Sequence, residues 1–412
     1  MGSGETSPTM VSVHRRLVDL IGRPAPGAVL LDTPYGFQQN AAEISAKARA
    51  YFLTSVGLRV TVPAGLGATG DGDTDRALAA LTSADWIFSG PGSPTYALTC
   101  WRANRAAHVL RERFVRPHGV LVFASAAAAT MGRFTVPVYE IYKVGAAPHW
   151  LDGLDLFGHL DLPVAVIPHY DNTEGGTHDT RYAYLGEPRL RALEQQLPDN
   201  AAVLGVDEHT AVLLDLHAGS LEVTGRGGLT VRRAGHSAVF PAGATLTLAE
   251  LRDLAAGRSR IPRHRTADDT PRPPSGPATP TLTETTAACT ARFDDGVRHG
   301  DAEAMVSAVL DLETAVHTWA ADTEEDEGTA QARTVLRTLV VRLGQAASTG
   351  LQDPGERIRP LVEPLVALRE RLRQRNDYAA ADGIRESLAT AGVDLRDTPT
   401  GPRWGLGTSP AG

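Results

Sequence analysis

Five short apolar runs, separated by helix-like or loop segments, constrain the fold of residues 28–243 more than any other feature. The runs are AVLLDT at 28–33, LRVTV at 58–62, ADWIFS at 84–89, GVLVFAS at 119–125 and LPVAVIP at 162–168. Continuous apolar runs flanked by turn residues are typical of strands buried on both faces of a parallel sheet. Because the stretches between them, such as 40–55, suit crossover helices, the sequence predicts an α/β sandwich.

The chain changes character after this region. Three runs at 211–216, 220–224 and 229–232 are short and punctuated by glycine, which predicts antiparallel strands that complete the first domain. The following stretch is rich in Pro, Ser, Thr and charge and has little apolar surface, so we expect a disordered linker. Helical periodicity then recurs at 293–319, 329–347 and 358–374. We therefore predict an α/β domain at 1–256, a linker at 257–287 and a mainly helical domain at 288–406.

Composition excludes several classes of function. The net charge of the 412 residues is −8, so any contact with RNA must come from a local patch. The two cysteines, Cys100 and Cys289, form no disulfide or metal-ligand pattern, and we expect neither a metal nor a cofactor. No apolar run approaches the ~18 residues of a membrane span, and the N-terminus lacks a signal-peptide core. We expect a cytoplasmic protein that does not bind membranes.

Ser125 is the first candidate for chemistry. The segment LVFASAAAATMG places it at the end of a predicted strand, ahead of five small residues that favour a helix. A serine on such a strand-to-helix turn has the nucleophile-elbow arrangement, and backbone N–H groups at the helix start can stabilise an oxyanion. Serine also needs a general base, normally a histidine that a carboxylate orients.

Two residues at the ends of later strands could complete this set. His169 closes the strand in VAVIPHYDN, and Glu208 follows another strand in LGVDEHTAVL. Because the carboxyl ends of parallel strands converge at one edge of a sheet, Ser125, His169 and Glu208 could meet there. Position alone leaves an alternative open, in which the serine is a helix cap and the histidine is structural.

Five blocks of the first domain resemble a known family. In chain order GSGETSPTM, SGPGSPTYAL, FASAAAATMG, IPHYDNTEGGTHDTR and GVDEHTAVLL are similar to the conserved blocks of the cyanophycinase and dipeptidase E serine peptidases. The resemblance covers about residues 1–245 and implies a class I glutamine amidotransferase-like (flavodoxin-like) parallel-sheet sandwich. It implies that Ser125, His169 and Glu208 are the catalytic residues. It further implies that backbone N–H groups near Ala126 and Gly92 form the oxyanion hole, and that His178 lines the substrate pocket.

The chain departs from this family in two ways. Phe123 and Ala127 stand where the family has glycines on either side of the nucleophile, so Phe123 either blocks the approach or forms a pocket wall. The family also has a strand ahead of its Gly-Glu turn, whereas this sequence enters that turn directly after Met1. Either the chain starts upstream of Met1 or the sheet lacks that strand.

The C-terminal segment RLRQRNDYAAADGIRESLATAGVDLRDTPTGPRWGL has the most specific pattern. It predicts a helix that ends near Arg375, an N-cap at Asp377, a second helix over 378–391 and a stop at Gly392. A short strand, VDLRD, and a turn that ends at Trp404 are expected to follow.

This segment resembles the anticodon-binding end of bacterial cysteinyl-tRNA synthetases, and the weaker upstream similarity extends the match to residues 286–406. The resemblance implies anticodon contacts by Arg373, Tyr378, Asp382 and Asp397. Such side chains can pair with exposed base edges or stack on a splayed base. A set of arginines could contact phosphates, or could equally lie on a solvated helix balanced by acidic residues: these are Arg357, Arg359, Arg369, Arg371, Arg373 and Arg375.

The catalytic half of a synthetase is missing, because the chain contains neither an H-I-G-H nor a K-M-S-K-S signature. The leading hypothesis is a serine hydrolase that acts on a peptide or on an aminoacyl or peptidyl substrate associated with cysteine tRNA, which the second domain binds. One alternative is a plain serine peptidase with a repurposed interaction domain. Another is a non-catalytic tRNA-binding protein with an inactive hydrolase fold. A homodimer is left open.

Overall fold

The computed structural model describes residues 1–67, 73–116, 118–173, 178–259, 279–320, 322, 327–349, 354–398 and 401–406. They fall into two compact units, which are Met1–Glu284 with Ala315–Gln331, and Thr285–Thr314 with Ala332–Gly412. Most of the expected linker at 257–287 lies outside the described residues, and helix α10 already begins at Leu282 within that range.

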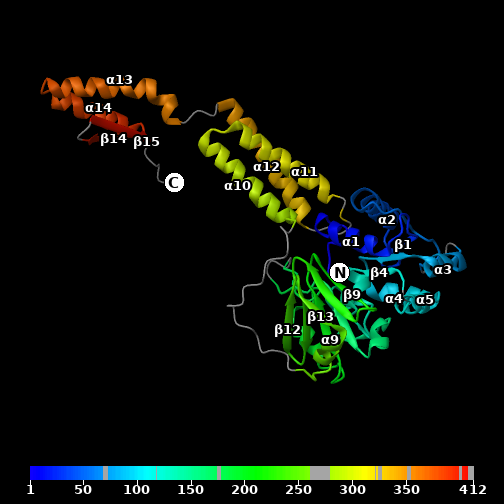
Figure 1. Ribbon diagram of the computed structural model, residues 1–412. Coiled ribbons are helices and arrows are strands. Elements are labelled where there is room, and N and C mark those ends of the chain that lie inside the picture. Colours follow the sequence, from blue (N-terminus) through cyan, green and yellow to red (C-terminus); the bar gives the residue numbers. More distant parts are fainter. Residues whose placement is uncertain are drawn as a thin grey trace. The chain divides into compact units, whose positions relative to one another are not determined.

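The first unit contains a four-stranded sheet in the order β2-β1-β3-β4, and its strands all run parallel (Figure 1). The strands are β1 (Ala28–Leu31), β2 (Val60–Thr61), β3 (Trp86–Ser89) and β4 (Val120–Phe123). Along β1, Val29 and Leu31 pack into one buried cluster, whereas Ala28 and Leu30 pack into another. Because successive side chains of a strand face opposite sides, both faces of this sheet are buried, as the apolar runs predicted.

A six-stranded sheet in the order β12-β11-β8-β7-β5-β6 carries the next part of the unit. Its parallel strands are β5 (Phe134–Thr135), β7 (Val164–Ile167) and β8 (Ala202–Val206); its antiparallel strands are β6 (Leu151–Asp152), β11 (Gly228–Arg233) and β12 (His236–Pro241). A third sheet pairs β9 (Thr210–Asp215), β10 (Ser220–Gly225) and β13 (Thr245–Thr247) in antiparallel fashion. The three antiparallel strands expected from the glycine-punctuated runs are therefore confirmed.

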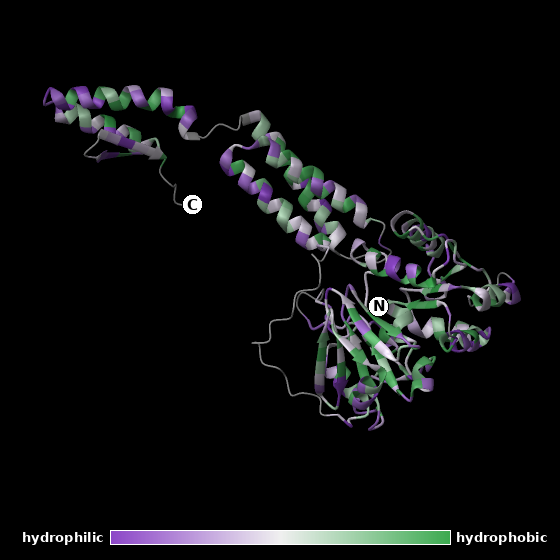
Figure 2. Ribbon diagram, in the orientation of Figure 1, coloured by the Kyte–Doolittle hydropathy of each residue, from purple (hydrophilic) through white to green (hydrophobic). Residues whose placement is uncertain are grey.

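Together with the strands, the helices of this unit form a mixed α/β architecture that contains a parallel sheet, as predicted. They are α1 (Val11–Ile21), α2 (Ala41–Tyr51), α3 (Thr74–Ser83), α4 (Pro94–Ala103), α5 (Ala106–Phe114), α6 (Ser125–Ala129), α7 (Val138–Tyr142), α8 (Gly186–Glu194) and α9 (Leu248–Ala255). Figure 2 shows hydrophobic residues concentrated on the strands of this unit.

Met1 and Gly2 join the parallel sheet to the third sheet. The Met1 amino group donates to the carbonyl oxygen of Phe123 at 2.8 Å, and the Ser125 N–H donates to the Met1 carbonyl at 3.3 Å. The Gly2 N–H donates to the Thr210 carbonyl at 2.9 Å. A Cβ on Gly2 would lie 2.0 Å from the backbone oxygen of Asp207, so only glycine fits at this crossing.

Three long helices open the C-terminal part of the chain: α10 (Leu282–His299), α11 (Ala302–Trp319) and α12 (Glu327–Thr349). The sequence predicted one helix over 293–319, which is wrong, because the chain turns at Gly300 with a φ of 69°. Asp301 then caps the new helix through its side chain, which accepts from the Ala304 N–H at 2.9 Å.

The end of the second unit folds around a small core of its own. Helices α13 (Pro354–Gln374) and α14 (Tyr378–Thr390) pack with the antiparallel hairpin β14 (Val393–Thr398) and β15 (Gly401–Leu406). The predicted N-cap is confirmed, since the Asp377 side chain accepts from the Ala380 N–H at 3.2 Å. Trp404 lies in β15 opposite Leu395, so the expected turn at this position is wrong: strand pairing extends the short VDLRD strand into a hairpin.

Candidate functional site

The turn between β4 and α6 holds Ser125 in a strained conformation. Its φ is 46°, in the left-handed region that residues other than glycine rarely adopt. The Ala127 N–H donates to the Gly90 carbonyl at 3.1 Å, which ties the turn to the residue that follows β3. This is the sharp strand-to-helix geometry of a nucleophile elbow.

The structure brings Ser125, His169 and Glu208 into one hydrogen-bonded chain. Ser125 Oγ lies 2.9 Å from His169 Nε2, and His169 Nδ1 lies 2.9 Å from Glu208 Oε1. His169 follows β7 and Glu208 follows β8, and these strands are parallel neighbours, so their carboxyl ends place both residues at one edge. The side chains of His169 and Glu208 are 17% and 26% exposed, so solvent reaches the site.

Glu208 is held as an anion by its neighbours. Burial alone would raise the pKa of its carboxyl, but hydrogen bonds from His169 and Asn172 outweigh burial and lower that pKa. Asn172 Nδ2 donates to Oε1 at 3.1 Å, and the Glu208 N–H donates to Asp171 Oδ1 at 2.7 Å. An ionised Glu208 can orient the His169 ring and stabilise its protonated form. Sequence reasoning missed Asn172, although its place three residues after His169 in the same block was a usable signal.

Two further carboxyl groups, those of Asp171 and Asp207, lie near Glu208. Burial raises the pKa of Asp171, and burial together with the charge of Asp171 raises the pKa of Asp207 to about 7. The Gly228 N–H donates to Asp207 Oδ2 at 2.7 Å. Within the described part of the chain, no three His, Cys, Asp or Glu residues are grouped so that they could hold a metal ion.

The residues expected to donate to an oxyanion lie on either side of the elbow. Ala126 is in the first turn of α6, where N–H groups have no acceptor within the helix. Gly92 has a φ of 129°, and a Cβ there would lie 2.1 Å from the Pro34 carbonyl oxygen, so this turn requires glycine. The bond from Ala127 to Gly90 places the Gly90–Gly92 turn next to the elbow.

Phe123 neither blocks the approach to Ser125 nor forms a pocket wall, and both expectations for it are wrong. Its side chain is 3% exposed and packs in the apolar core, where its ring lies 6.3 Å from the Trp101 ring in a T-shaped arrangement. Val122 packs in the other buried cluster, so alternation along β4 places the two side chains on opposite faces of the sheet. Ala127 is fully buried in the same cluster.

His178 belongs to an aromatic stack beside His169. The Tyr142 ring stacks on His178 at 6.4 Å and on Tyr184 at 5.2 Å. The neighbouring Ala183 N–H donates to the His169 carbonyl at 3.1 Å, so the segment that carries Tyr184 returns to the backbone of His169. Residues 174–177 of the same block lie outside the described residues.

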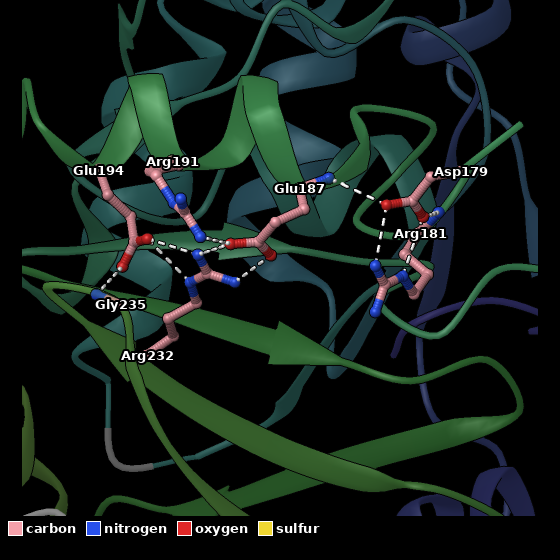
Figure 3. A network of polar contacts seen from close by, with 7 residues as sticks. All are labelled: Asp179, Arg181, Glu187, Arg191, Glu194, Arg232 and Gly235. Carbon is pink, nitrogen blue, oxygen red and sulfur yellow. Dashed lines mark hydrogen bonds and ion pairs between the residues drawn. The ribbon is translucent and has the colours of Figure 1, made fainter.

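A network of ion pairs fixes this returning segment (Figure 3). Arg232 on β11 bonds both oxygens of Glu187 at 2.8 Å and one oxygen of Glu194 at 2.8 Å, and its own side chain is 6% exposed. Hydrogen bonding to Arg232 lowers the pKa of Glu187 to about 2. The Glu187 N–H donates to Asp179 Oδ2, which connects α8 to the residue that follows His178.

All four residues expected to contact an anticodon are exposed, and two of them, Tyr378 and Asp382, lie on α14. Tyr378 is 55% exposed, and its hydroxyl donates to Asn376 at 3.1 Å, so a face of its ring is open to solvent. Asp382 is also exposed. Both side chains are available to a ligand.

Asp397 and Arg373 are 46% and 41% exposed, but they also form an ion pair with each other. Arg369 bonds the two Asp397 oxygens at 2.8 Å each, and Arg373 bonds one of them at 3.1 Å. These bonds, that from Arg369 above all, lower the pKa of Asp397. The Arg369 side chain is 1% exposed, so the expectation that it contacts phosphate is wrong: its charge is used to attach the hairpin to α13.

Comparison with known proteins supports a relationship for the C-terminal domain. No family model matches the chain. The C-terminal domain is similar to cysteine–tRNA ligases, with 41% identity over 83 residues to that of Streptomyces coelicolor and 38% over 93 residues to that of Leifsonia xyli. The matches cover 19% and 21% of this chain, and only 14% and 20% of the two ligases.

Among solved structures, a peptidase from an acI-B1 actinobacterium aligns with 60% of this chain and 94% of its own, at 16% identity and a TM-score of 0.44.

In the described residues, no helix is both long enough and apolar enough to cross a membrane.

Proposed function

We propose that the first unit is a serine hydrolase. The observation that carries the proposal is the continuous hydrogen-bonded chain from Ser125 Oγ through His169 to Glu208 Oε1, built on an elbow of positive φ. This is the arrangement that turns a weakly nucleophilic hydroxyl into a nucleophile.

In the proposed reaction His169 Nε2 takes the Ser125 proton while Oγ attacks the substrate carbonyl carbon. Glu208 keeps the imidazole in the required tautomer and stabilises its positive charge. Backbone N–H groups of Ala126 and Gly92 donate to the developing oxyanion. His169 then protonates the leaving group, and a water molecule, deprotonated by the same ring, releases the acyl group from Ser125.

We further propose that the C-terminal domain binds the anticodon arm of cysteine tRNA, so that the hydrolase acts on a peptide or on an aminoacyl or peptidyl substrate associated with that tRNA. The similarity to cysteine–tRNA ligases supports this proposal, as do the open faces of Tyr378 and Asp382. An exposed tyrosine can stack on a splayed base, and a carboxylate can accept from a base amino group.

The hydrolase is tested by labelling the full-length chain with a fluorophosphonate probe. We expect the wild type to label and Ser125→Ala to lose labelling, because alanine retains the fold without the nucleophile. Ser237→Ala, a change of an exposed serine on β12, is the matched control and should label normally. Equal labelling of wild type and Ser125→Ala would remove the assignment of the nucleophile. A wild type that does not label would leave a non-catalytic tRNA-binding protein.

The tRNA interaction is tested by filter binding of purified tRNAs to the full-length chain. Tyr378→Ala should weaken binding of cysteine tRNA by about 1–3 kcal/mol, the value of one base stack. Asp382→Ala should reduce the preference over other tRNAs by about 1–3 kcal/mol. Asp394→Ala, which removes an exposed carboxylate of β14, is the control. Equal affinity for cysteine tRNA and an unrelated tRNA would contradict anticodon recognition, and absence of binding would favour a peptidase with a repurposed interaction domain.

A further inference from the structure

The end of helix α11 belongs to the same compact unit as the hydrolase residues. Ala315–Gln331 groups with Met1–Glu284, although the rest of α11 lies in the second unit. The Trp319 side chain is 6% exposed, and its ring lies 5.7 Å from the His209 ring in a T-shaped arrangement. Asp322 Oδ1 accepts a hydrogen bond from Thr6 Oγ1 at 2.8 Å.

His209 directly follows Glu208 in the sequence, and several contacts fix its ring. Its Nδ1 lies 3.0 Å from Thr9 Oγ1 and 3.5 Å from Ser7 Oγ. A Cβ on Gly4 would lie 2.2 Å from the same nitrogen, and Gly4 has a φ of 62°, so the turn that faces His209 requires glycine. His209 could not be singled out from sequence, because its partners come from distant parts of the chain.

The backbone of His209 is also strained, with a φ of 51°. This region is unfavourable for a residue other than glycine, which stays there only when the surrounding structure holds it in place. The turn at residues 4–9 supplies one side of these surroundings, and Trp319 supplies another. Rotation of this backbone would also displace Glu208, whose N–H bonds Asp171 at 2.7 Å and whose carboxylate bonds His169 at 2.9 Å.

We propose that Trp319 and Asp322 are positioning residues for Glu208, which act through His209 and the turn at residues 4–9. The inference rests on the proposed hydrolase function and adds that the end of α11 is a structural part of the active site. A segment that lies well outside the α/β domain in sequence would thus set the orientation of Glu208.

The pH dependence of Ser125 labelling can show whether Trp319 positions Glu208 or only stabilises the fold, because polar groups surround Glu208. His169 and Asn172 bond its carboxylate, and Asp171 accepts from its N–H. The charges of Asp207 and His209 also act on it. If Trp319 is removed and Glu208 loses its orientation, the protonated His169 ring is less stabilised. The rate of Ser125 labelling should then fall, and the midpoint of its pH dependence should move to lower pH.

The experiment measures fluorophosphonate labelling rates against pH in the full-length chain, with thermal unfolding of each variant. We expect Trp319→Ala to label about tenfold more slowly with a lowered pH midpoint, as a displaced catalytic group would. Trp319→Phe should recover most of the rate, because it keeps an aromatic ring against His209. Leu310→Ala, a change of a 58% exposed side chain on the same helix, is the control and should match the wild type.

A second variant covers the case in which Trp319→Ala does not fold. His209→Asn keeps a residue that tolerates the left-handed conformation but removes the ring that Trp319 contacts. It should also label about tenfold more slowly. Wild-type rates and an unchanged pH midpoint in a folded Trp319→Ala, or in His209→Asn, would overturn the proposal. A wild type that itself fails to label would instead refute the hydrolase function.

Discussion

The charge interactions next to Glu208 can be tested through Asp207, whose ionisation should make the free energy of unfolding depend on pH. Its carboxyl follows β8 and accepts from the Gly228 N–H at 2.7 Å. Burial, and then the charge of Asp171, raises its pKa from 3.8 to about 7. We consider the change Asp207→Asn, which keeps an oxygen for the Gly228 N–H but cannot ionise.

The sign follows from the two pKa values. Because the folded pKa lies above the unfolded one, folding favours the protonated carboxyl, and its contribution is fully present below about pH 4. That contribution is lost as the pH rises to about 7, where the folded protein also ionises. About three pH units at about 1.4 kcal/mol each set a ceiling of about 4 kcal/mol. Since Asp207 is partly exposed and water screens its charge, we expect about 2–4 kcal/mol.

Urea unfolding of wild type and Asp207→Asn at about pH 4 and about pH 8 measures this quantity. At each pH the free energy of unfolding of wild type is subtracted from that of the variant. This difference should be about 2–4 kcal/mol larger at the higher pH than at the lower. Asp19→Asn, a change of an exposed carboxyl on α1, should show the same difference from wild type at both pH values. If Asp207→Asn also shows a constant difference, the raised pKa is wrong.

Two further predictions concern buried residues of the first unit. Phe123→Ala should lower the free energy of unfolding by about 3–5 kcal/mol in urea, because a core side chain is removed, and it should not speed probe labelling of Ser125. Faster labelling would restore the view that Phe123 crowds the elbow. Arg232→Met should cost about 3–5 kcal/mol, measured by urea unfolding, because Glu187 and Glu194 lose their buried cation. Adding Glu194→Gln should recover part of that loss, and no recovery would show that the cost lies in packing instead.

Most of the parallel strands could be predicted from sequence, because burial on both faces leaves a continuous apolar run. Two strands could not: Phe134–Thr135 and Leu151–Asp152 contain two residues each, and only their pairing in the six-stranded sheet defines them. The break at Gly300 was missed for a related reason. Apolar periodicity continues on both sides of it, so only the backbone conformation of the glycine reveals the turn.

That Ser125, His169 and Glu208 lie together could be predicted from sequence, whereas their catalytic role remains a proposal. Ser125, His169 and Glu208 each follow a predicted strand, and the convergence of strand ends is a property of the whole parallel sheet. Asn172 and His209 were not found, because their roles depend on loop conformations. Phe123 was misjudged because its burial in the apolar core beside Trp101 depends on tertiary packing, which the turn sequence alone does not show.

In the C-terminal domain, the sequence does not show whether a charged residue contacts RNA or another residue of the protein. Arg369 and Asp397 both belong to a segment that resembles an RNA-binding one, and either charge alone suits a contact with RNA. Together they form a two-bond ion pair that joins α13 to β14, with the arginine almost fully buried. Arg369 and Asp397 lie 28 positions apart in the sequence, which does not show whether each side chain pairs within the protein or with a ligand. Ion pairing separates the two cases here, because all three side chains are exposed. Tyr378 and Asp382 remain open to a ligand, whereas Asp397 keeps only the acceptor capacity that Arg369 and Arg373 leave.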